Sequence, residues 1–344
     1  MDRREFLAGV GAVGVGGFLA ACAPAPAPAS VASPTATPFK IKLGFVSVSA
    51  ANSAIWAAED GGYLKKYGLA AEVLGIADST QAVPSILTGD TPINCGLSGT
   101  ALVASGLQGS DLVFVGVTIN TFPSSIYVKS SIQSAAALRG GKVGVTRFGT
   151  ASDTAGRIGL KQVGLDPARD VTLIQTGGLN ESLAAMQSGQ LDAGVLSPPV
   201  TLLARTAGFR ELVDVSNAGV EYVYNGIATS RGFAKQNPAV IENVLKAVIE
   251  GVQRFRTDAE FGKKVTADRT KLQDQAQVEE TWRLFATKYL KQPPFLTDAA
   301  LQSVLDELSA NNAKAKAATP KDFYDNSFLK KLEDAGFIRS VVGP

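Results

Sequence analysis

The chain has 344 residues, of which 45% are hydrophobic and 19% charged, and its formal net charge is +2. These values exclude an intrinsically disordered chain and an extended basic surface for nucleic acid, and the length allows two domains of ordinary size. Histidine is absent, and Cys22 and Cys95 are the two cysteines. Zinc clusters and catalytic centres built on histidine are therefore excluded, and we expect neither a metal nor a cofactor.

The first 38 residues have the pattern of an export signal followed by a tether. A twin-arginine pair at positions 3 and 4 precedes an apolar run that is too short for an ordinary membrane-spanning helix. The run ends in Leu-Ala-Ala-Cys22, which resembles the lipobox of bacterial lipoproteins; the resemblance implies cleavage before Cys22 and lipidation of its thiol. The alternative is an uncleaved N-terminal anchor. We predict a signal peptide over 1–21 and a Pro/Ala/Ser/Thr-rich tether over 22–38.

In the first part of the body, short hydrophobic segments alternate with helical patterns, and short loops join them. This alternation predicts a mostly parallel α/β sheet. The expected strands are 41–47, 71–76, 92–96, 112–119 and 125–129.

A second unit with the same layout begins near Ser130. Its expected strands are 142–146, 171–175, 193–196 and 211–215, with a return strand at 222–229. Gly89 and Gly189 end corresponding helices in the two halves, which indicates two similar lobes. From Asn237 onward the pattern is helical, and Asn237-Pro238 is typical of a helix cap and first position.

The stretch 139–156 contains the most informative turn. A strand from Lys142 to Thr146 is followed by a polar turn and then a helix start, an arrangement that favours an anionic or strongly polar group at the helix N-terminus. The alternative is that Thr150 or Ser152 only caps the helix. Arg147 indicates a carboxylate, sulfonate or phosphate ligand, unless it forms a surface ion pair instead.

Four polar turns follow strands in the two halves, at the edge of an open α/β sheet where ligands bind. Two lobes that each present such an edge would form a cleft lined by hydroxyls, amides and backbone N–H groups. Apolar walls could come from Trp56, Phe122, Phe148, Tyr222 and Tyr224, and the alternative for most of these aromatic residues is packing in the core. The predicted ligand-binding residues are Ser47, Ser49, Asn52, Ser98, Gly99, Thr100, Asn120, Arg147, Phe148, Gly149, Thr150, Ala151, Ser152, Ser197, Pro198 and Asn225.

Several segments resemble a known family. The segment 61–69, GGYLKKYGL, resembles the "GYF-K-x-x-GL" signature of solute-binding proteins of ABC importers, and 140–145, 183–192 and 197–199 resemble later parts of those proteins. The group binds nitrate, sulfonates, taurine and pyrimidine precursors and is often called NMT1-like. The resemblance covers about 41–255.

The resemblance implies a type II periplasmic-binding fold, in which two α/β lobes joined by two crossovers close on a solute by hinge motion. It places 39–129 and 223–344, with the C-terminal helices, in one lobe, and 130–222 in the other. The eukaryotic pyrimidine-synthase relatives use a histidine and a cysteine-rich iron motif, and this chain has neither. That activity is therefore not expected.

The implied function is that of an extracytoplasmic, lipid-anchored and monomeric solute-binding protein. It would capture a sulfonate, carboxylate, pyrimidine or flavin-like molecule and deliver it to an ABC permease and its ATPase. One alternative is a ligand-sensing receptor. Another is a secreted enzyme in which Arg147 binds a substrate carboxylate and Asp153 or Lys142 is the acid or base. No base–nucleophile pair is apparent, so we predict no catalytic residue.

Overall fold

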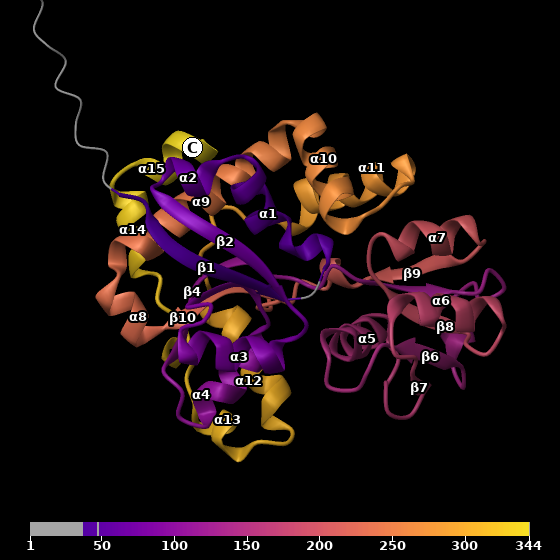
Figure 1. Ribbon diagram of the computed structural model, residues 1–344. Helices are drawn as coiled ribbons and strands as arrows, with labels where there is room; N and C mark the ends of the chain where they lie inside the picture. Colours follow the sequence, from indigo (N-terminus) through magenta and orange to yellow (C-terminus); the bar gives the residue numbers. More distant parts are fainter. Residues whose placement is uncertain (1–36, 47, 344) are drawn as a thin grey trace, which may run out of the picture. The chain divides into compact units, whose positions relative to one another are not determined.

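The computed structural model describes residues 37–46 and 48–343 (Figure 1). Cys22, the predicted signal peptide and almost all of the tether lie outside the described residues, and so does Ser47. In the part of the chain that is described, no helix is both long and apolar enough to cross a membrane.

The first sheet has five strands in the order β2-β1-β3-β10-β4. Strand β1 is parallel to β2 and β3, whereas β10 is antiparallel to both of its neighbours, β3 and β4. The bounds are β1 Phe39–Val46, β2 Leu69–Ile76, β3 Ile93–Leu97, β4 Leu112–Ile119 and β10 Asn225–Ser230.

The second sheet repeats this plan in the order β7-β6-β8-β5-β9. Strand β6 is parallel to β7 and β8, and β5 is antiparallel to β8 and β9. In each sheet the fourth strand is thus the antiparallel one. The bounds are β5 Ser125–Val128, β6 Lys142–Val145, β7 Thr172–Gln175, β8 Ala193–Leu196 and β9 Arg210–Asp214.

The position of β5 corrects the expected lobe boundary. Residues 125–129 were expected in the first lobe, but β5 hydrogen-bonds to β8 and β9 of the second sheet. The chain leaves the first sheet after Ile119, so the first crossover is 120–124. The second crossover, 215–224, is also longer than expected, because the return strand begins at Asn225 and not at Tyr222.

Helices cover both faces of each sheet. In the first lobe, α1, α2 and α9 lie on one side, and α3, α4 and α12 on the other (Figure 1). In the second lobe, α5 packs in one hydrophobic cluster and α6 and α7 in another. The first-lobe bounds are α1 Ser53–Asp60, α2 Tyr63–Lys66, α3 Ser79–Thr88, α4 Gly99–Leu107, α8 Arg231–Gln236, α9 Pro238–Thr257, α10 Ala259–Thr270, α11 Gln275–Leu284, the π-helical turn η4 Phe285–Tyr289, α12 Asp298–Ser309, α13 Ala313–Ala317, α14 Ser327–Asp334 and α15 Phe337–Val342. The second-lobe bounds are α5 Ala151–Gln162, α6 Leu179–Gln187 and α7 Val200–Thr206.

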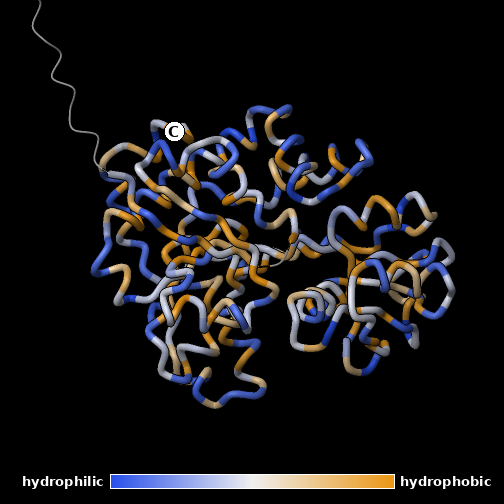
Figure 2. The backbone as a smooth tube through the Cα atoms, viewed as in Figure 1, coloured by the Kyte–Doolittle hydropathy of each residue, from blue (hydrophilic) through white to orange (hydrophobic). Residues whose placement is uncertain are grey.

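Burial follows the hydrophobic pattern. Hydrophobic residues form runs along the strands of both sheets, whereas hydrophobic and hydrophilic residues alternate along the outer helices (Figure 2). Helix α9 buries the apolar stripe expected from the sequence, with Val244 and Val248 each 1% exposed. Pro238 occupies the first turn as predicted, but Asn237 does not cap the helix with its side chain; its amide donates to the Phe233 carbonyl oxygen instead, at 3.2 Å.

The two halves also match in their helix ends. Gly89 ends α3 with φ 84°, and Gly189 follows α6 with φ 79°. Both values lie in the left-handed region that glycine adopts without strain. The similar layout expected for the two halves is therefore present in the backbone.

Candidate functional site

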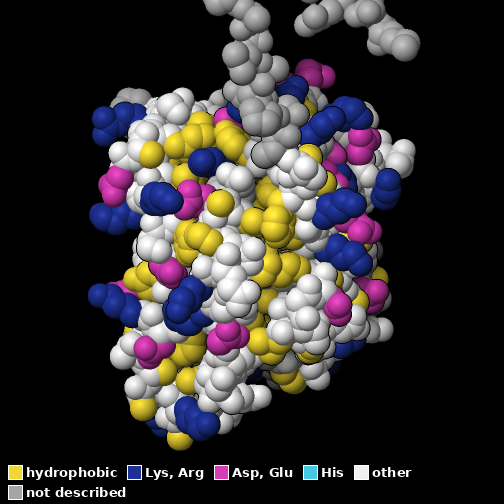
Figure 3. Space-filling view, turned by 60° about the vertical axis from the view of Figure 1, so that its left-hand side comes forward, with side chains coloured by type: hydrophobic (Ala, Val, Ile, Leu, Met, Phe, Trp, Pro, Cys, Tyr) yellow, Lys and Arg dark blue, Asp and Glu magenta, His cyan; other side chains and the backbone are white. Residues whose placement is uncertain are grey.

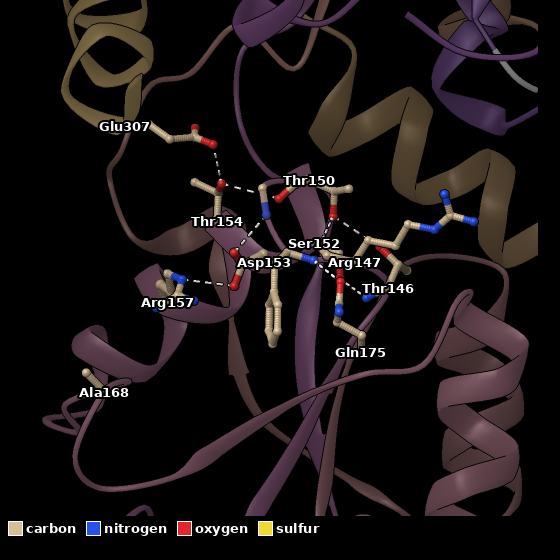
Figure 4. Close-up of polar contacts among 12 residues, drawn as sticks. Thr146, Arg147, Thr150, Ser152, Asp153, Thr154, Arg157, Ala168, Gln175 and Glu307 are labelled. Atoms are coloured by element: carbon tan, nitrogen blue, oxygen red, sulfur yellow. Dashed lines mark hydrogen bonds and ion pairs between the residues drawn. The ribbon is translucent and has the colours of Figure 1, made fainter. Parts of the chain in front are cut away.

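The turn after β6 is held by its own hydrogen bonds. The Thr150 hydroxyl donates to the Arg147 carbonyl oxygen at 2.7 Å, and the Gly149 N–H donates to the Asp153 carboxylate at 3.0 Å (Figure 4). Gly149 has φ 75°, which allows the chain to reverse between the strand and α5. The Asp153 carboxylate also accepts from Arg157 Nε at 2.9 Å. These bonds connect the turn to the start of α5.

Neither predicted hydroxyl caps α5. Thr150 stands at the cap position, but its hydroxyl donates to a carbonyl and accepts no helix N–H. The Ser152 hydroxyl accepts from the backbone N–H of Thr146, at 3.2 Å. The capping interpretation of this turn is therefore wrong, and these two hydroxyls join the strand end to the helix start.

Two side chains of the turn are exposed. Phe148 is 49% exposed, and only its backbone N–H is bonded, to Gln175 Oε1 at 2.9 Å. The Arg147 side chain extends away from the hydrogen-bonded groups (Figure 4). Within the described residues Arg147 forms no ion pair, so the surface-pair alternative finds no support. Hydrogen bonds from Thr80 and Gln81 and, more weakly, the charge of Arg147 lower the pKa of Asp78, at the start of α3 in the first lobe.

The first lobe contributes a cluster of hydroxyls at the start of α4. Ser98 Oγ accepts from the Ala101 N–H at 3.4 Å and lies 3.4 Å from the hydroxyl oxygens of both Ser79 and Thr100. Gly99 is buried: its N–H donates to the Val223 carbonyl oxygen at 2.8 Å, and a Cβ there would lie 2.6 Å from Val304 Cγ2. Gly99 therefore serves close packing in this structure.

The loop after β1 is also engaged locally. Ser49 Oγ accepts from the Ala51 N–H at 3.3 Å, and Asn52, which is 1% exposed, donates to the Val46 carbonyl oxygen at 3.0 Å. Ser47 precedes them but is not among the described residues. A ligand-binding role of this loop stays a prediction.

The remaining predicted residues lie in or next to the crossovers. Asn225 is 3% exposed, and its amide donates to the Ala51 carbonyl oxygen at 2.7 Å. Asn120 donates to Glu221 Oε1 at 3.3 Å, and Ser197 Oγ lies 2.9 Å from Ser124 Oγ. Pro198 is buried. These groups bond to the protein in this structure, and their contact with a ligand stays a prediction.

Sequence reasoning missed the residue that joins the two lobes beside this site. Glu307, on α12, accepts from Thr154 Oγ1 on α5 at 2.7 Å (Figure 4). It also accepts from Tyr222 Oη in the second crossover at 2.7 Å. Burial raises the pKa of Glu307, and the nearby Asp153 adds to this, whereas the two hydroxyl bonds oppose it. Burial and Glu307 likewise raise the pKa of Tyr222, and the Thr100 hydroxyl opposes that rise. No local pattern marks Glu307, because one acidic residue on an amphipathic helix is ordinary.

Five surface hollows in the described part are lined by other residues. One of about 520 Å³ lies on the second lobe and is lined in part by Lys142 and Gln175. It adjoins the turn only through Gln175, which holds the Phe148 N–H. On the face shown in Figure 3, basic and acidic side chains are interspersed, so this face offers no extended basic surface.

A family model described as NMT1/THI5 like matches residues 50–260, more than half of the chain. The chain belongs to the NMT1/THI5-like family. The resemblance seen in the sequence is thereby confirmed. No curated protein matches the chain at a significant level.

Solved structures show the fold of this NMT1/THI5-like protein. The aliphatic sulphonate-binding protein SsuA from Escherichia coli is similar with a TM-score of 0.67 and 19% identity, over 83% of this chain and 99% of that chain. The nitrate-binding protein NrtA from Synechocystis PCC 6803 is similar with a TM-score of 0.66 and 15% identity, over 89% of this chain and 91% of that chain. The desulfurization enzyme DSZB is similar with a TM-score of 0.62 and 18% identity, over 86% of this chain and 99% of that chain. The expected type II periplasmic-binding fold, with two mixed sheets, flanking helices and C-terminal helices, is confirmed.

Proposed function

We propose that the protein is a lipid-anchored solute-binding protein that captures a small anionic molecule outside the cytoplasm and delivers it to an ABC importer. The observation that carries the proposal is the family match over 50–260 on a two-lobed type II fold. Similar structures include proteins named for sulfonate and nitrate binding. Two lobes joined by two crossovers are the architecture that closes on a ligand by hinge motion.

The second-lobe turn supplies the ligand chemistry of this proposal. Arg147 offers an exposed guanidinium without an ion-pair partner among the described residues, and it lies two residues after the end of β6. Phe148, the next residue, exposes about half of its side chain, which favours a ligand with an apolar body beside its charged group. We therefore propose an organic sulfonate or carboxylate as the solute.

A thermal-shift screen tests this function. The full-length chain carrying Cys22→Ser is heated with nitrate, alkanesulfonates, MOPS, taurine, aromatic carboxylates, pyrimidines and riboflavin. A ligand present at a hundredfold excess over its Kd raises the free energy of unfolding by about 2.7 kcal/mol, which gives a clear shift of Tm. We expect organic anions with an apolar body to shift Tm; a panel without any shift contradicts the proposal.

Calorimetric titration of the best compound then tests the role of Arg147. Arg147→Ala should lower its affinity roughly tenfold to a hundredfold, because a hydrogen bond to a charged group is lost. Arg169→Ala is the matched control, since Arg169 is 81% exposed in the same lobe and pairs with Asp166. Equal affinity of the Arg147 variant and the control contradicts the assignment.

The anchor is proposed from the lipobox pattern at Cys22 alone. Mass spectrometry of the protein from its native membrane should show an N-terminal diacylglyceryl-modified cysteine, and Cys22→Ser should release the protein from the membrane fraction. An unmodified, uncleaved N-terminus contradicts this part.

An uptake experiment distinguishes transport from sensing. Vesicles that contain the permease and ATPase should take up the solute if the protein serves transport, whereas sensing requires no uptake.

The enzyme alternative is disfavoured by the geometry of its acid and base. Lys142 begins β6 and Arg147 follows the end of that strand, so the extended chain separates them by on the order of 10 Å or more. The Asp153 carboxylate is occupied by Gly149 and Arg157. These two observations count against the proposed acid and base, although DSZB shows that the fold also occurs in an enzyme.

A further inference from the structure

One carboxylate links three parts of the chain that are distant in sequence. Glu307 belongs to α12 of the first lobe, Thr154 to the first turn of α5 in the second lobe, and Tyr222 to the second crossover. Each oxygen of the carboxylate accepts one hydroxyl hydrogen bond at 2.7 Å, and Figure 4 shows the one from Thr154. Two short bonds to one carboxylate group fix a direction as well as a distance.

Tyr222 is rigidly held at this junction. It is 2% exposed, its ring lies 4.4 Å from that of Phe122 in the first crossover, and its N–H donates to the Asn120 carbonyl oxygen at 2.8 Å. The tyrosine therefore connects both crossovers to Glu307, and a rotation of one lobe against the other must move this contact.

Thr154 passes the contact on to the ligand turn. Its N–H donates to the Thr150 carbonyl oxygen at 3.0 Å, and the adjacent Asp153 holds the Gly149 N–H. The turn that presents Arg147 and Phe148 is thus hydrogen-bonded to Thr154, whose hydroxyl donates to Glu307.

We propose that Glu307 is a positioning residue, which sets the angle between the two lobes by binding α5 and the second crossover at once. The proposal does not depend on the identity of any solute. A wider range of lobe angles lowers the fraction of molecules whose site is correctly arranged, and the apparent affinity for a ligand falls by that fraction.

Two ion pairs also bridge the lobes, and their dependence on salt concentration differs from that of the Glu307 hydrogen bonds. Arg205 of α7 pairs with Glu280 of α11, and Lys288 of η4 pairs with Asp214 at the end of β9. Pairs of opposite charge weaken at high ionic strength, whereas a carboxylate that accepts neutral hydroxyls is little affected. At 1 M salt the lobe angle should therefore depend more on Glu307 than at low salt.

Pulsed electron spin resonance measures the distance between lobes. Spin labels are placed by Glu72→Cys on β2 and Gln187→Cys on α6, both exposed positions, in the full-length chain with Cys22→Ser. The remaining cysteine, Cys95, is 1% exposed and stays unlabelled in the folded protein. Distance distributions are recorded without ligand at 0.1 M and 1 M salt.

Glu307→Leu removes both acceptors and should broaden the distance distribution, with a larger effect at 1 M salt. Glu307→Gln restores a narrow distribution, because its amide bonds both hydroxyls. The matched control is Asp306→Leu, which likewise replaces an acidic residue by leucine, at an exposed neighbour whose carboxylate accepts from Gln302 of its own helix. A folded Glu307→Leu chain with the wild-type distribution, or a Gln variant as broad as the Leu variant, overturns the proposal.

Two milder variants keep the test valid if Glu307→Leu does not fold. Thr154→Val and Tyr222→Phe preserve shape and each remove one hydroxyl. Each should broaden the distribution in a chain that retains Glu307, and the two together should do no more than Glu307→Leu. Wild-type distributions for both variants overturn the proposal.

Discussion

Side chains of the right type for ligand binding are mostly bonded to the protein itself. Asn225 was predicted from its polarity and its place in the return strand, but its amide partner, Ala51, is 174 positions away in the sequence. Polarity and position can be predicted from the sequence, whereas such a partner cannot, because it depends on how two distant segments are packed. Arg147 and Phe148 were the predictions that ended with exposed side chains.

At this scale we predict a pH-dependent contribution of Asp192, which ties β5 to β6. The Asp192 carboxylate accepts hydrogen bonds from the Lys129 ammonium at 2.7 Å and from the backbone N–H of Lys142 at 2.9 Å. Both bonds lower the pKa of Asp192, and the bond from Lys129 does so more strongly. A carboxylate whose pKa is lowered in the folded state stabilises the fold at pH values above the ordinary pKa of aspartate, near 3.9. This contribution to the free energy of unfolding is lost as the pH falls through the lowered pKa.

Asp192→Asn should therefore reduce the free energy of unfolding at pH 7 by up to about 1 kcal/mol, since the group is partly solvent-screened. The difference from wild type should shrink between pH 4 and pH 2. Urea unfolding at several pH values measures both. Asp90→Asn is the control, since the exposed Asp90 carboxylate accepts from the Thr88 hydroxyl at 3.1 Å. An Asp192 effect that does not change with pH contradicts the prediction.

We also predict that the Cys95 thiol is inert in the folded protein. Burial raises its pKa to about 12, so almost none of it is thiolate at pH 8. In the Cys22→Ser chain, Ellman's reagent should find no reactive thiol before unfolding and one equivalent in 6 M guanidinium chloride. Rapid reaction of the native protein would show that β3 opens readily.

At the scale of strands and helices, the period of the hydrophobic pattern predicted nearly every strand. Strands 112–119 and 193–196 have the expected bounds, seven others shift by one or two residues, and the return strand begins three residues later than expected. What the pattern could not predict is the sheet to which β5 belongs. All four of its residues are buried, and a short apolar run pairs equally well with either sheet until the connections decide.

The contact between α9 and α1 provides a prediction at this scale. A Cβ on Gly251 would lie 2.6 Å from the backbone nitrogen of Ala58, and backbone atoms cannot move aside cheaply. Gly251→Ala should therefore lower the free energy of unfolding by about 1–3 kcal/mol, as overpacking does. Gly232→Ala on α8 is the control, since a Cβ there would lie 3.4 Å from Asp111 Oδ2, and it should be neutral or slightly stabilising. Equal urea midpoints for the two variants contradict the close contact.

For the whole molecule, family and fold could be predicted from the segment 61–69 and from the repeated layout, because both are local patterns. The contacts between the lobes could not be predicted. Glu307, Glu280 and Lys288 lie in the C-terminal helical region, where the sequence pattern indicated only ordinary core packing and surface polarity.

The Arg205–Glu280 pair yields a prediction at this scale. Arg205 also donates to Tyr127 Oη at 2.9 Å, and the Glu280 side chain is only 13% exposed. Arg205→Ala should cost about 1–3 kcal/mol, because it leaves a largely buried carboxylate without its partner. In a double-mutant cycle with Glu280→Gln, the coupling should exceed that of the exposed Arg169–Asp166 pair, which is expected below about 1 kcal/mol. Couplings of equal size contradict a structural role for the pair.

Strand β5 follows β4 in the chain but belongs to the second sheet, whereas β10 follows β9 but belongs to the first sheet. This exchange of strands has a consequence for biosynthesis. All five strands of the second sheet lie within 125–214, so that sheet can be completed as soon as this segment has left the ribosome. The first sheet needs β10, which is inserted between β3 and β4. Those two strands must therefore wait for residues 225–230, and the half of the protein that is synthesised first is the last to be finished.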